Sequence, residues 1–293
     1  MCGSGNHQGF IADTTLTRRR LLATMAAAAA ANGLAAPAFA KDPGARPVVE
    51  RDVSVKTADG HADAALFRPA GTGKWPAVLM WPDILGLRPV FREMGKRLAA
   101  QGYVVLVPNP YYRAQKAPIV TGPFDFNDKA AMTRISRFRS GLTDAMADRD
   151  SAAYVAFLDA QPQTDRARKA AVQGFCMSGP LAFRTAAARP DRIGAVATFH
   201  PGALVTGEPS SPHLLIPKTR AAYLVIIAKN DAEKMSREKP DLDAAFAKAK
   251  RPAKVEISSA NHGWTVAGSQ TYDEKEAERA WGELLPFYRA SLR

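Results

Sequence analysis

Short apolar runs alternate with longer amphipathic segments along the chain from residue 48 onward. The short runs are rich in valine, isoleucine and alanine, which is typical of strands buried on both faces of a sheet. In the longer segments apolar residues recur every three or four positions, as Phe91, Met94 and Leu98 do, and this spacing predicts helices. The expected buried strands span residues 77–81, 103–107, 170–173, 193–199, 222–228 and 254–258, and the expected helices span residues 90–101, 142–158, 181–188, 240–250 and 272–291. This alternation predicts an α/β fold, with a mostly parallel sheet and helices on both faces.

Two stretches depart from this alternation. Residues 48–56 and 62–68 alternate apolar and polar side chains on either side of Asp59-Gly60, which predicts an antiparallel pair at the edge of the sheet. Residues 109–140 show no regular period and are rich in proline, arginine and aromatic residues. We therefore expect an irregular connection there, and a connection of this length usually carries function or covers a site.

The first forty residues have the order of an export signal. A basic cluster, Thr17-Arg18-Arg19-Arg20-Leu21-Leu22, runs into an alanine-rich stretch, and Ala38-Phe39-Ala40 offers small residues where signal peptidase cleaves. The paired arginines before Leu-Leu resemble the twin-arginine signal. We expect residues 1–40 to be read by the twin-arginine export machinery and removed, which leaves residues 41–293 as a single domain in the periplasm or outside the cell. The stretch is too weakly apolar for stable membrane insertion, and the alternative is an alanine-rich segment with no targeting role.

Charge and cysteine content narrow the possible partners. The formal net charge is +12, but beyond the signal the lysines and arginines are scattered without interleaved aromatics, so we expect no nucleic-acid partner and only a bias toward anionic substrates. The chain has two cysteines, and Cys2 lies in the expected signal, so no internal disulfide is expected. A lone thiol at Cys176 in an oxidising compartment indicates a reactive role, with an inert buried cysteine as the alternative. The histidines show no spacing typical of metal ligands, and no metal site is expected.

The sequence around the lone thiol carries the strongest chemical signal. In Gly174-Phe175-Cys176-Met177-Ser178-Gly179 a short strand runs into a helix through small residues, which is typical of the tight turn that exposes a nucleophile. Cys176 at the centre of this turn would face the positive end of the following helix, which favours a thiolate. The alternative nucleophile is Ser178, flanked by Cys176 and Pro180, although a proline is bulky against the strand.

A nucleophile needs a base, and the base needs a group that orients it. Asp231 follows the apolar run that ends at Ala228, and His262 follows the last expected strand. Both therefore lie past the carboxyl ends of strands, in the chain order nucleophile, acid, histidine. We expect Cys176, Asp231 and His262 to form a catalytic triad. The alternative for His262 is a loop histidine in a structural hydrogen bond, and His200 is also expected to be structural.

These features together resemble the dienelactone hydrolase family of the α/β-hydrolase fold. The resemblance covers essentially all of the chain after residue 48 and rests on segments 83–87, 101–105, 110–113, 174–179, 230–231 and 261–264. It implies an oxyanion hole formed by the N–H groups of Met177 and Ile84, and no cofactor. It also implies an acidic residue beside the thiol at Asp83, where the family usually has glutamate, although Asp83 is equally suited to cap the loop before Val90.

The resemblance has consequences for substrate binding as well. Arg113 matches a family arginine that binds a substrate carboxylate, whereas a second such arginine is absent, because Val266 stands in its place. Apart from the resemblance, Trp81 and Trp264 are expected to line the pocket, and the alternative is that they pack in the core. The expected activity is hydrolysis of a small ester or lactone, with a bias toward anionic substrates, through an acyl-thioester intermediate. The alternatives are a carboxylesterase or thioesterase of the same fold, a non-catalytic binding protein that retains the fold, and a thiol sensor.

Overall fold

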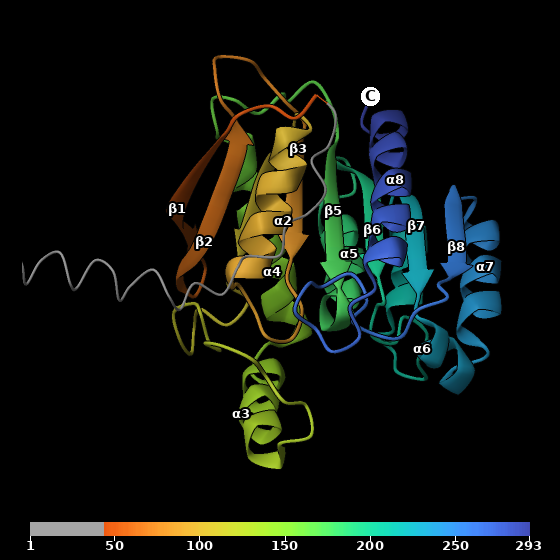
Figure 1. The fold of residues 1–293 in the computed structure, drawn as a ribbon. Coiled ribbons are helices and arrows are strands. Elements are labelled where there is room, and N and C mark those ends of the chain that lie inside the picture. Colours follow the sequence, from red (N-terminus) through yellow and green to blue (C-terminus); the bar gives the residue numbers. More distant parts are fainter. Residues whose placement is uncertain (1–43) are drawn as a thin grey trace, which may run out of the picture. The chain divides into compact units, whose positions relative to one another are not determined.

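A mostly parallel sheet of eight strands organises the computed structural model, which describes residues 44–293 (Figure 1). The strand order is β1-β2-β4-β3-β5-β6-β7-β8. The strands are β1 (Val48–Thr57), β2 (Gly60–Pro69), β3 (Ala77–Trp81), β4 (Val104–Pro108), β5 (Ala170–Phe175), β6 (Ile193–Phe199), β7 (Ala222–Ile227) and β8 (Ala253–Ile257). From β4 to β8 every neighbouring pair is parallel. The prediction of an α/β fold with a mostly parallel sheet is confirmed.

The strands follow the apolar pattern of the sequence closely. Every residue of β3, β4 and β5 is buried, as expected for strands covered on both faces. The predicted antiparallel edge pair is also confirmed, because β1 pairs with β2 in a register that joins Thr57 to Gly60. Gly60 turns the chain with a φ of 133°, a conformation that residues with a Cβ rarely adopt.

Helices cover the two faces of the sheet in separate layers. One core cluster joins α2 (Pro89–Ala100) and α8 (Glu274–Ser291) to Val78 and Met80 of β3. The other joins α4 (Asp144–Asp159), α5 (Gly179–Ala188) and α7 (Glu238–Ala249) to Leu79 and Trp81 of the same strand. Alternate residues of β3 therefore serve opposite layers, which is the period-two geometry of a strand inside a three-layer fold.

The connection from residue 109 to residue 140 is less irregular than the sequence predicts, because it contains the helix α3 (Lys129–Ser140). Asp128 caps this helix by accepting hydrogen bonds from the N–H groups of Ala130 and Ala131 at 2.8 and 3.1 Å. Only Ile135 of the helix is buried, so the sequence of α3 has no broad apolar stripe that would predict a helix. In Figure 1 α3 projects at the edge of the sheet where the parallel strands end.

Three short helical segments were also not predicted: η1 (Cys176–Ser178), η2 (Pro212–Lys218) and α6 (Lys229–Lys234). Within residues 44–293, no helix combines the length and apolar character needed to span a membrane. The expected export signal, residues 1–40, lies outside the described residues.

Candidate active site

Cys176 occupies a sharp turn between β5 and α5. It starts η1 with a φ of 54°, in the left-handed region that costs a non-glycine residue energy. Its carbonyl accepts a hydrogen bond of 2.6 Å from the N–H of Gly202, in the loop after β6. The thiol is partly exposed. A strained backbone that is held from a neighbouring loop is typical of functional positions.

The turn is possible only because small residues surround it. A Cβ placed on Gly174 would lie 2.2 Å from the carbonyl oxygen of Ser178, and one on Gly179 would lie 2.4 Å from the Cβ of Pro201. Real side chains do not approach backbone this closely. The prediction that Gly174 is needed for close packing of strand and helix is therefore confirmed.

Ser178, the alternative nucleophile, is fully buried and used by the turn itself. Its Oγ accepts a hydrogen bond of 2.8 Å from the N–H of Phe175. The same oxygen lies 2.9 Å from the carbonyl oxygens of Trp81 and of Phe175, either of which can accept its proton. A hydroxyl held in this way joins β3 to the turn and does not face solvent, so the arrangement excludes Ser178 as the attacking group.

Asp231 and His262 lie beyond the carboxyl ends of β7 and β8 and meet there. The Nδ1 of His262 is 2.5 Å from Oδ2 of Asp231. The His262 main chain is also fixed, because its N–H donates to Oδ1 of Asn230 at 2.8 Å and its carbonyl accepts from Oγ1 of Thr271 at 2.6 Å. Cys176 is also close enough to the ring to influence its pKa. The predicted acid and histidine are thus hydrogen-bonded to each other, and the fold brings Cys176 close to them.

The surroundings of His262 favour its charged form. Burial lowers the pKa of the imidazole, but the hydrogen bonds to Asp231 and Cys176 outweigh burial and raise the pKa to about 10. The ring is therefore protonated at neutral pH and presents a positive charge to the sulfur. A neighbouring imidazolium stabilises a thiolate.

His200 is a second histidine at the site, and the sequence analysis expects it to be structural. It follows β6, is fully buried, and has a φ of 38°. Its Nε2 lies 2.7 Å from Oγ1 of Thr265, and its ring meets that of His262 edge to face with centroids 4.9 Å apart. Burial, reinforced by the charge of His262, holds the pKa of His200 well below its usual range. It therefore supports the His262 ring without adding a second positive charge.

Ile84 lies in the loop after β3, where the resemblance places one wall of an oxyanion hole. The N–H of Ile84 has no hydrogen-bond acceptor among residues 44–293, whereas its carbonyl accepts a bond of 3.0 Å from the hydroxyl of Tyr111. That hydroxyl also lies 4.0 Å from Sδ of Met177, the residue after the thiol. Tyr111 therefore links the two positions expected to hold an oxyanion.

Asp83 is engaged within its own loop. Its Oδ1 accepts from the N–H of Leu85 at 2.9 Å, and Arg88 binds both carboxylate oxygens at 2.6 and 2.8 Å. These contacts match the loop-capping alternative. The expected contact between Asp83 and the thiol remains a prediction.

Arg113 is likewise occupied by carboxylates of the chain. Its guanidinium binds both oxygens of Asp150, whose side chain is fully buried, and also binds Asp59. Burial lowers the pKa of Arg113, but these bonds raise it further above its ordinary value. A role in binding a substrate carboxylate remains a prediction. It would require Arg113 to bind a third carboxylate in addition to those of Asp59 and Asp150.

Trp264 does not line a surface open to substrate. Its side chain is fully buried and packs edge to face against Phe199 and His200, with ring centroids 6.3 and 6.0 Å apart. The expectation that it contacts substrate is not supported. Trp81 is also fully buried, with its Nε1 donating to Oγ1 of Thr185 at 3.0 Å.

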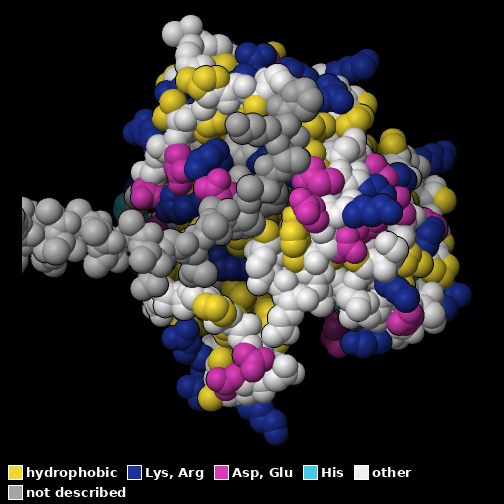
Figure 2. All heavy atoms as spheres, in the orientation of Figure 1, with side chains coloured by type: hydrophobic (Ala, Val, Ile, Leu, Met, Phe, Trp, Pro, Cys, Tyr) yellow, Lys and Arg dark blue, Asp and Glu magenta, His cyan; other side chains and the backbone are white. Residues whose placement is uncertain are grey.

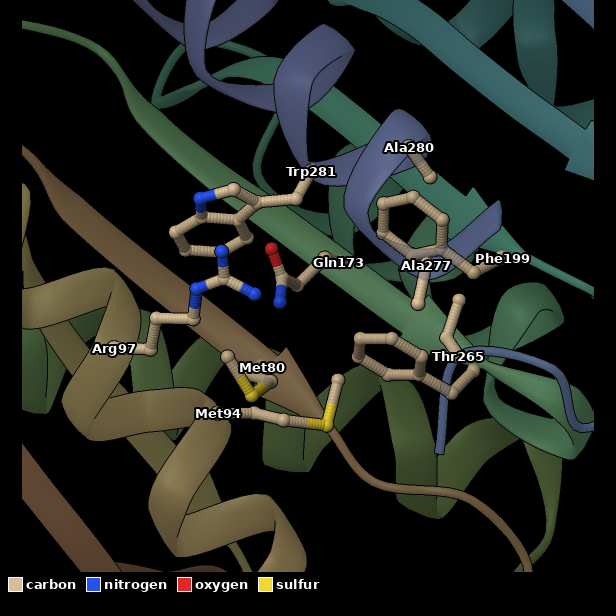
Figure 3. A pocket seen from close by; sticks show the side chains of 10 residues that line it. Met80, Met94, Arg97, Gln173, Phe199, Thr265, Ala277, Ala280 and Trp281 are labelled. Atoms are coloured by element: carbon tan, nitrogen blue, oxygen red, sulfur yellow. The ribbon is translucent and has the colours of Figure 1, made fainter. Parts of the chain in front are cut away.

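Two hollows lie near this constellation. A narrow cavity of about 40 Å³ lies between α2 and α8, over the central strands β3, β5 and β6, and Figure 3 shows the amide of Gln173 in its interior. Its lining does not include Cys176, Asp231 or His262. A more open polar hollow beside His262 is lined in part by Asn261 and Thr271. The candidate site is therefore assigned from Cys176, His262 and Asp231 and not from this cavity. Among residues 44–293, no cluster of three or more potential metal ligands occurs.

Comparison with known proteins agrees with this geometry. The profile of the dienelactone hydrolase family matches residues 62–292. The chain belongs to this family. It is a hydrolase of this class, which acts on ester bonds, including those of lactones.

Individual relatives show how far the similarity extends. A protein of Methylorubrum extorquens is 27% identical over 290 residues, which is 95% of this chain and 94% of the relative. The carboxymethylenebutenolidase of Pseudomonas sp. strain P51 is 36% identical over 133 residues, 44% of this chain and 51% of the relative. A crystal structure from Klebsiella pneumoniae has a TM-score of 0.73 at 20% identity, covering 83% of this chain and 99% of that one. This last likeness shows the α/β-hydrolase fold alone.

Proposed function

We propose that Cys176, His262 and Asp231 are the nucleophile, base and orienting acid of a hydrolase that cleaves a small ester or lactone. The observation that carries this proposal is the pairing of His262 with Asp231, with Nδ1 and Oδ2 2.5 Å apart, close enough to Cys176 for the thiol to influence the histidine. The nucleophile lies on a turn that holds Cys176 at positive φ. A strained, partly exposed thiol next to an imidazolium has no evident structural role, whereas this arrangement is what nucleophilic catalysis requires.

The reaction would proceed through an acyl-thioester. The Cys176 thiolate adds to the substrate carbonyl carbon, and the N–H groups of Ile84 and Met177 bind the oxyanion that forms. When the carbon–oxygen bond of the ester breaks, His262 gives its proton to the leaving alkoxide. In a lactone this alkoxide remains attached to the acyl chain. Asp231 holds the imidazole in the required tautomer throughout.

Water completes the cycle. His262, now neutral, removes a proton from a water molecule, and the resulting hydroxide adds to the thioester carbon. Breakage of the carbon–sulfur bond releases the carboxylic acid and returns the thiolate to its imidazolium partner. Every proton and electron pair is accounted for by the substrate, water and the three side chains, so no cofactor is required.

Replacing Cys176 by alanine tests the proposal directly. We expect hydrolysis of 4-nitrophenyl acetate to fall by about 10³-fold or more, because the attacking atom is lost. The wild-type activity should also disappear after treatment with iodoacetamide. Retained hydrolysis by a folded Cys176→Ala variant would refute the proposal. Absence of hydrolysis by the wild type on a panel of esters, lactones and thioesters would favour a binding protein of this fold.

The same proposal extends to where the enzyme acts. The basic, alanine-rich and Ala38-Phe39-Ala40 sequence supports export by the twin-arginine machinery to the periplasm or beyond. A carboxylesterase or thioesterase of the same fold is the second candidate. Choice among these substrates depends on the loops around the thiol.

A further inference from the structure

Residues 200–202, the segment that follows β6, contact both halves of the candidate active site. The N–H of Gly202 donates to the carbonyl of Cys176 at 2.6 Å. At the other end of the segment, the ring of His200 meets that of His262 with centroids 4.9 Å apart and an interplanar angle of 62°. One short segment therefore touches the turn of the proposed nucleophile and the ring of the proposed base.

His200 is anchored through its main chain and through its side chain. Its N–H donates to the carbonyl of Ile226 in β7 at 2.8 Å. Its Nε2 lies 2.7 Å from Oγ1 of Thr265, which stands three residues after His262 in the loop that follows β8. His200 therefore joins β7 to the loop that carries His262, and Thr265 fixes the orientation of its ring.

His200 occupies this place at an energetic cost. Its φ of 38° lies in the left-handed region, which is unfavourable for a residue with a Cβ. The side chain is fully buried, and its Nδ1 has no hydrogen-bond partner among residues 44–293. A buried polar nitrogen without a partner is unfavourable, and such features persist mainly where function requires them. An apolar ring would fill the space without this cost, so packing alone does not account for a histidine here.

Burial also separates His200 from the charged surface. Figure 2 shows Lys and Arg side chains interspersed with Asp and Glu on the face in view, where water solvates them. Burial, and after it the charge of His262, holds the pKa of His200 well below its usual range, so its ring is neutral. Asp231 and Cys176 are the titratable groups that favour the charged form of His262. A neutral neighbour can hold that charged ring in place without repelling it.

The hydrogen bond to Asp231 does not by itself orient the His262 ring. It fixes Nδ1, but the ring can still tilt about that contact. Because Nδ1 is bound to Asp231, Nε2 is the nitrogen left for the thiol, and its direction depends on the plane of the ring. The His200 ring, inclined to that of His262, restricts the tilt from one side.

We propose that His200 is a positioning residue: held by Thr265, its ring keeps the His262 imidazole in the plane in which Nε2 faces the Cys176 thiol. The inference rests on the proposed function. It gives residues 200–202 a single task, which is to hold nucleophile and base in register by contacting both. Because His200 is fully buried, it acts through His262 and not on the substrate.

Replacing Thr265 by valine tests the inference, because valine has nearly the same shape but lacks the hydroxyl that holds His200. In the full chain with Cys2→Ser, Cys176 is the single thiol, and its alkylation by iodoacetamide reports the thiolate. We expect the alkylation rate at about pH 6, relative to that at about pH 9, to fall about threefold, because a displaced imidazolium stabilises the thiolate less. Hydrolysis of 4-nitrophenyl acetate should lose about tenfold in kcat with little change in KM.

The proton between His262 and Asp231 gives a direct view of the ring. A short hydrogen bond of this kind produces a proton resonance far downfield, and Asp231→Asn identifies the resonance by removing it. In Thr265→Val the resonance should broaden or move upfield, because the ring is held less firmly. An unchanged resonance together with an unchanged alkylation ratio overturns the proposal.

Three further variants separate positioning from a general loss of stability. Thr265→Ser keeps the hydroxyl and should restore both the alkylation ratio and kcat. Thr198→Val removes another buried hydroxyl, one without a hydrogen-bond partner among residues 44–293, and should change neither. His200→Asn accepts the positive φ but does not replace the ring, so it should exceed Thr265→Val in effect. Equal effects of Thr265→Val and Thr198→Val, or no recovery in Thr265→Ser, reject the inference.

The outcomes also distinguish this inference from the proposed function. If the wild type hydrolyses no ester while the alkylation ratio still falls in Thr265→Val, then the proposed function fails and the positioning of His262 stands. If the wild type hydrolyses the ester and Thr265→Val changes neither kcat nor the ratio, then the proposed function stands and the role of His200 is rejected.

Discussion

At the scale of single residues, Cys176 and Ser178 lie two positions apart but differ in role. Cys176 is the proposed nucleophile, whereas Ser178 is structural. The Ser178 hydroxyl joins the turn to β3 through buried hydrogen bonds. We expect Ser178→Ala to lower the free energy of unfolding by about 1–3 kcal/mol, because the N–H of Phe175 loses its buried acceptor. Urea unfolding measures this loss. Hydrolysis and its sensitivity to iodoacetamide should persist, and a stable Ser178→Ala variant without activity would contradict the assignment.

His262 makes stability depend on pH in a defined direction. Its pKa in the folded chain is raised to about 10, above the value of 6.5 for a free histidine. The folded state therefore binds this proton more tightly, and the stabilisation is complete below about pH 6.5 and declines as the pH rises through about 10. Urea unfolding at several pH values between 6 and 10 should show this decline. Asp231→Asn should flatten it, and a variant with an unaltered slope would refute the coupling.

Sequence reasoning identified the residues whose roles follow from local order. Cys176 stands in a recognisable turn, and Asp231 and His262 follow strands, so all three could be predicted to meet. The partners of Arg113 could not, because Asp59 and Asp150 are far from it in sequence and only the fold brings them together. The contact of His200 with His262 could not be predicted either, because these two residues are also far apart in the sequence.

At the scale of elements, the β5–α5 turn is the least tolerant part of the fold. Gly174→Ala would force a Cβ to within 2.2 Å of the Ser178 carbonyl oxygen. We expect a loss of about 3 kcal/mol or more in unfolding free energy, because backbone on both sides must shift. Thermal unfolding measures it.

Gly282 is the matched control for this substitution. It lies within α8, and a Cβ there would meet no atom within 4 Å. Gly282→Ala should therefore stabilise the chain by up to about 1 kcal/mol through helix propensity. Equal effects of the two substitutions would contradict the steric argument.

The strands were easier to predict than the helix α3. Buried strands appear as continuous apolar runs, whereas α3 buries only Ile135 and depends on its Asp128 cap. Its polar, arginine-rich sequence therefore gave no helical period. Elements that contact the core on a narrow face remain hard to recognise from sequence alone.

At the scale of the whole molecule, the strand order could not be read from the sequence. The α/β alternation predicts a parallel sheet, but the placement of β4 between β2 and β3 depends on a crossover that leaves no local signal. The family resemblance, not the periodicity, implied the α/β-hydrolase arrangement.

The predicted export signal, residues 1–40, acts on the whole protein and can be tested by mutation. Replacing Arg18, Arg19 and Arg20 by lysine keeps the charge of the amino-terminal segment but removes the paired arginines. We expect the variant to remain in the cytoplasm of a bacterial host, as judged by fractionation and immunoblotting, because the twin-arginine pathway reads arginine. Normal export of the variant would refute a twin-arginine signal.

The order of Cys176, Asp231 and His262 along the chain has a consequence for the timing of reactivity. The ribosome makes Cys176 first and the proposed base, His262, much later, after β8, the strand that completes the sheet. Until β8 pairs with β7, the ring that contacts the sulfur has no fixed position. A growing or half-folded chain therefore carries an ordinary cysteine, and the reactive centre exists only once the fold is closed.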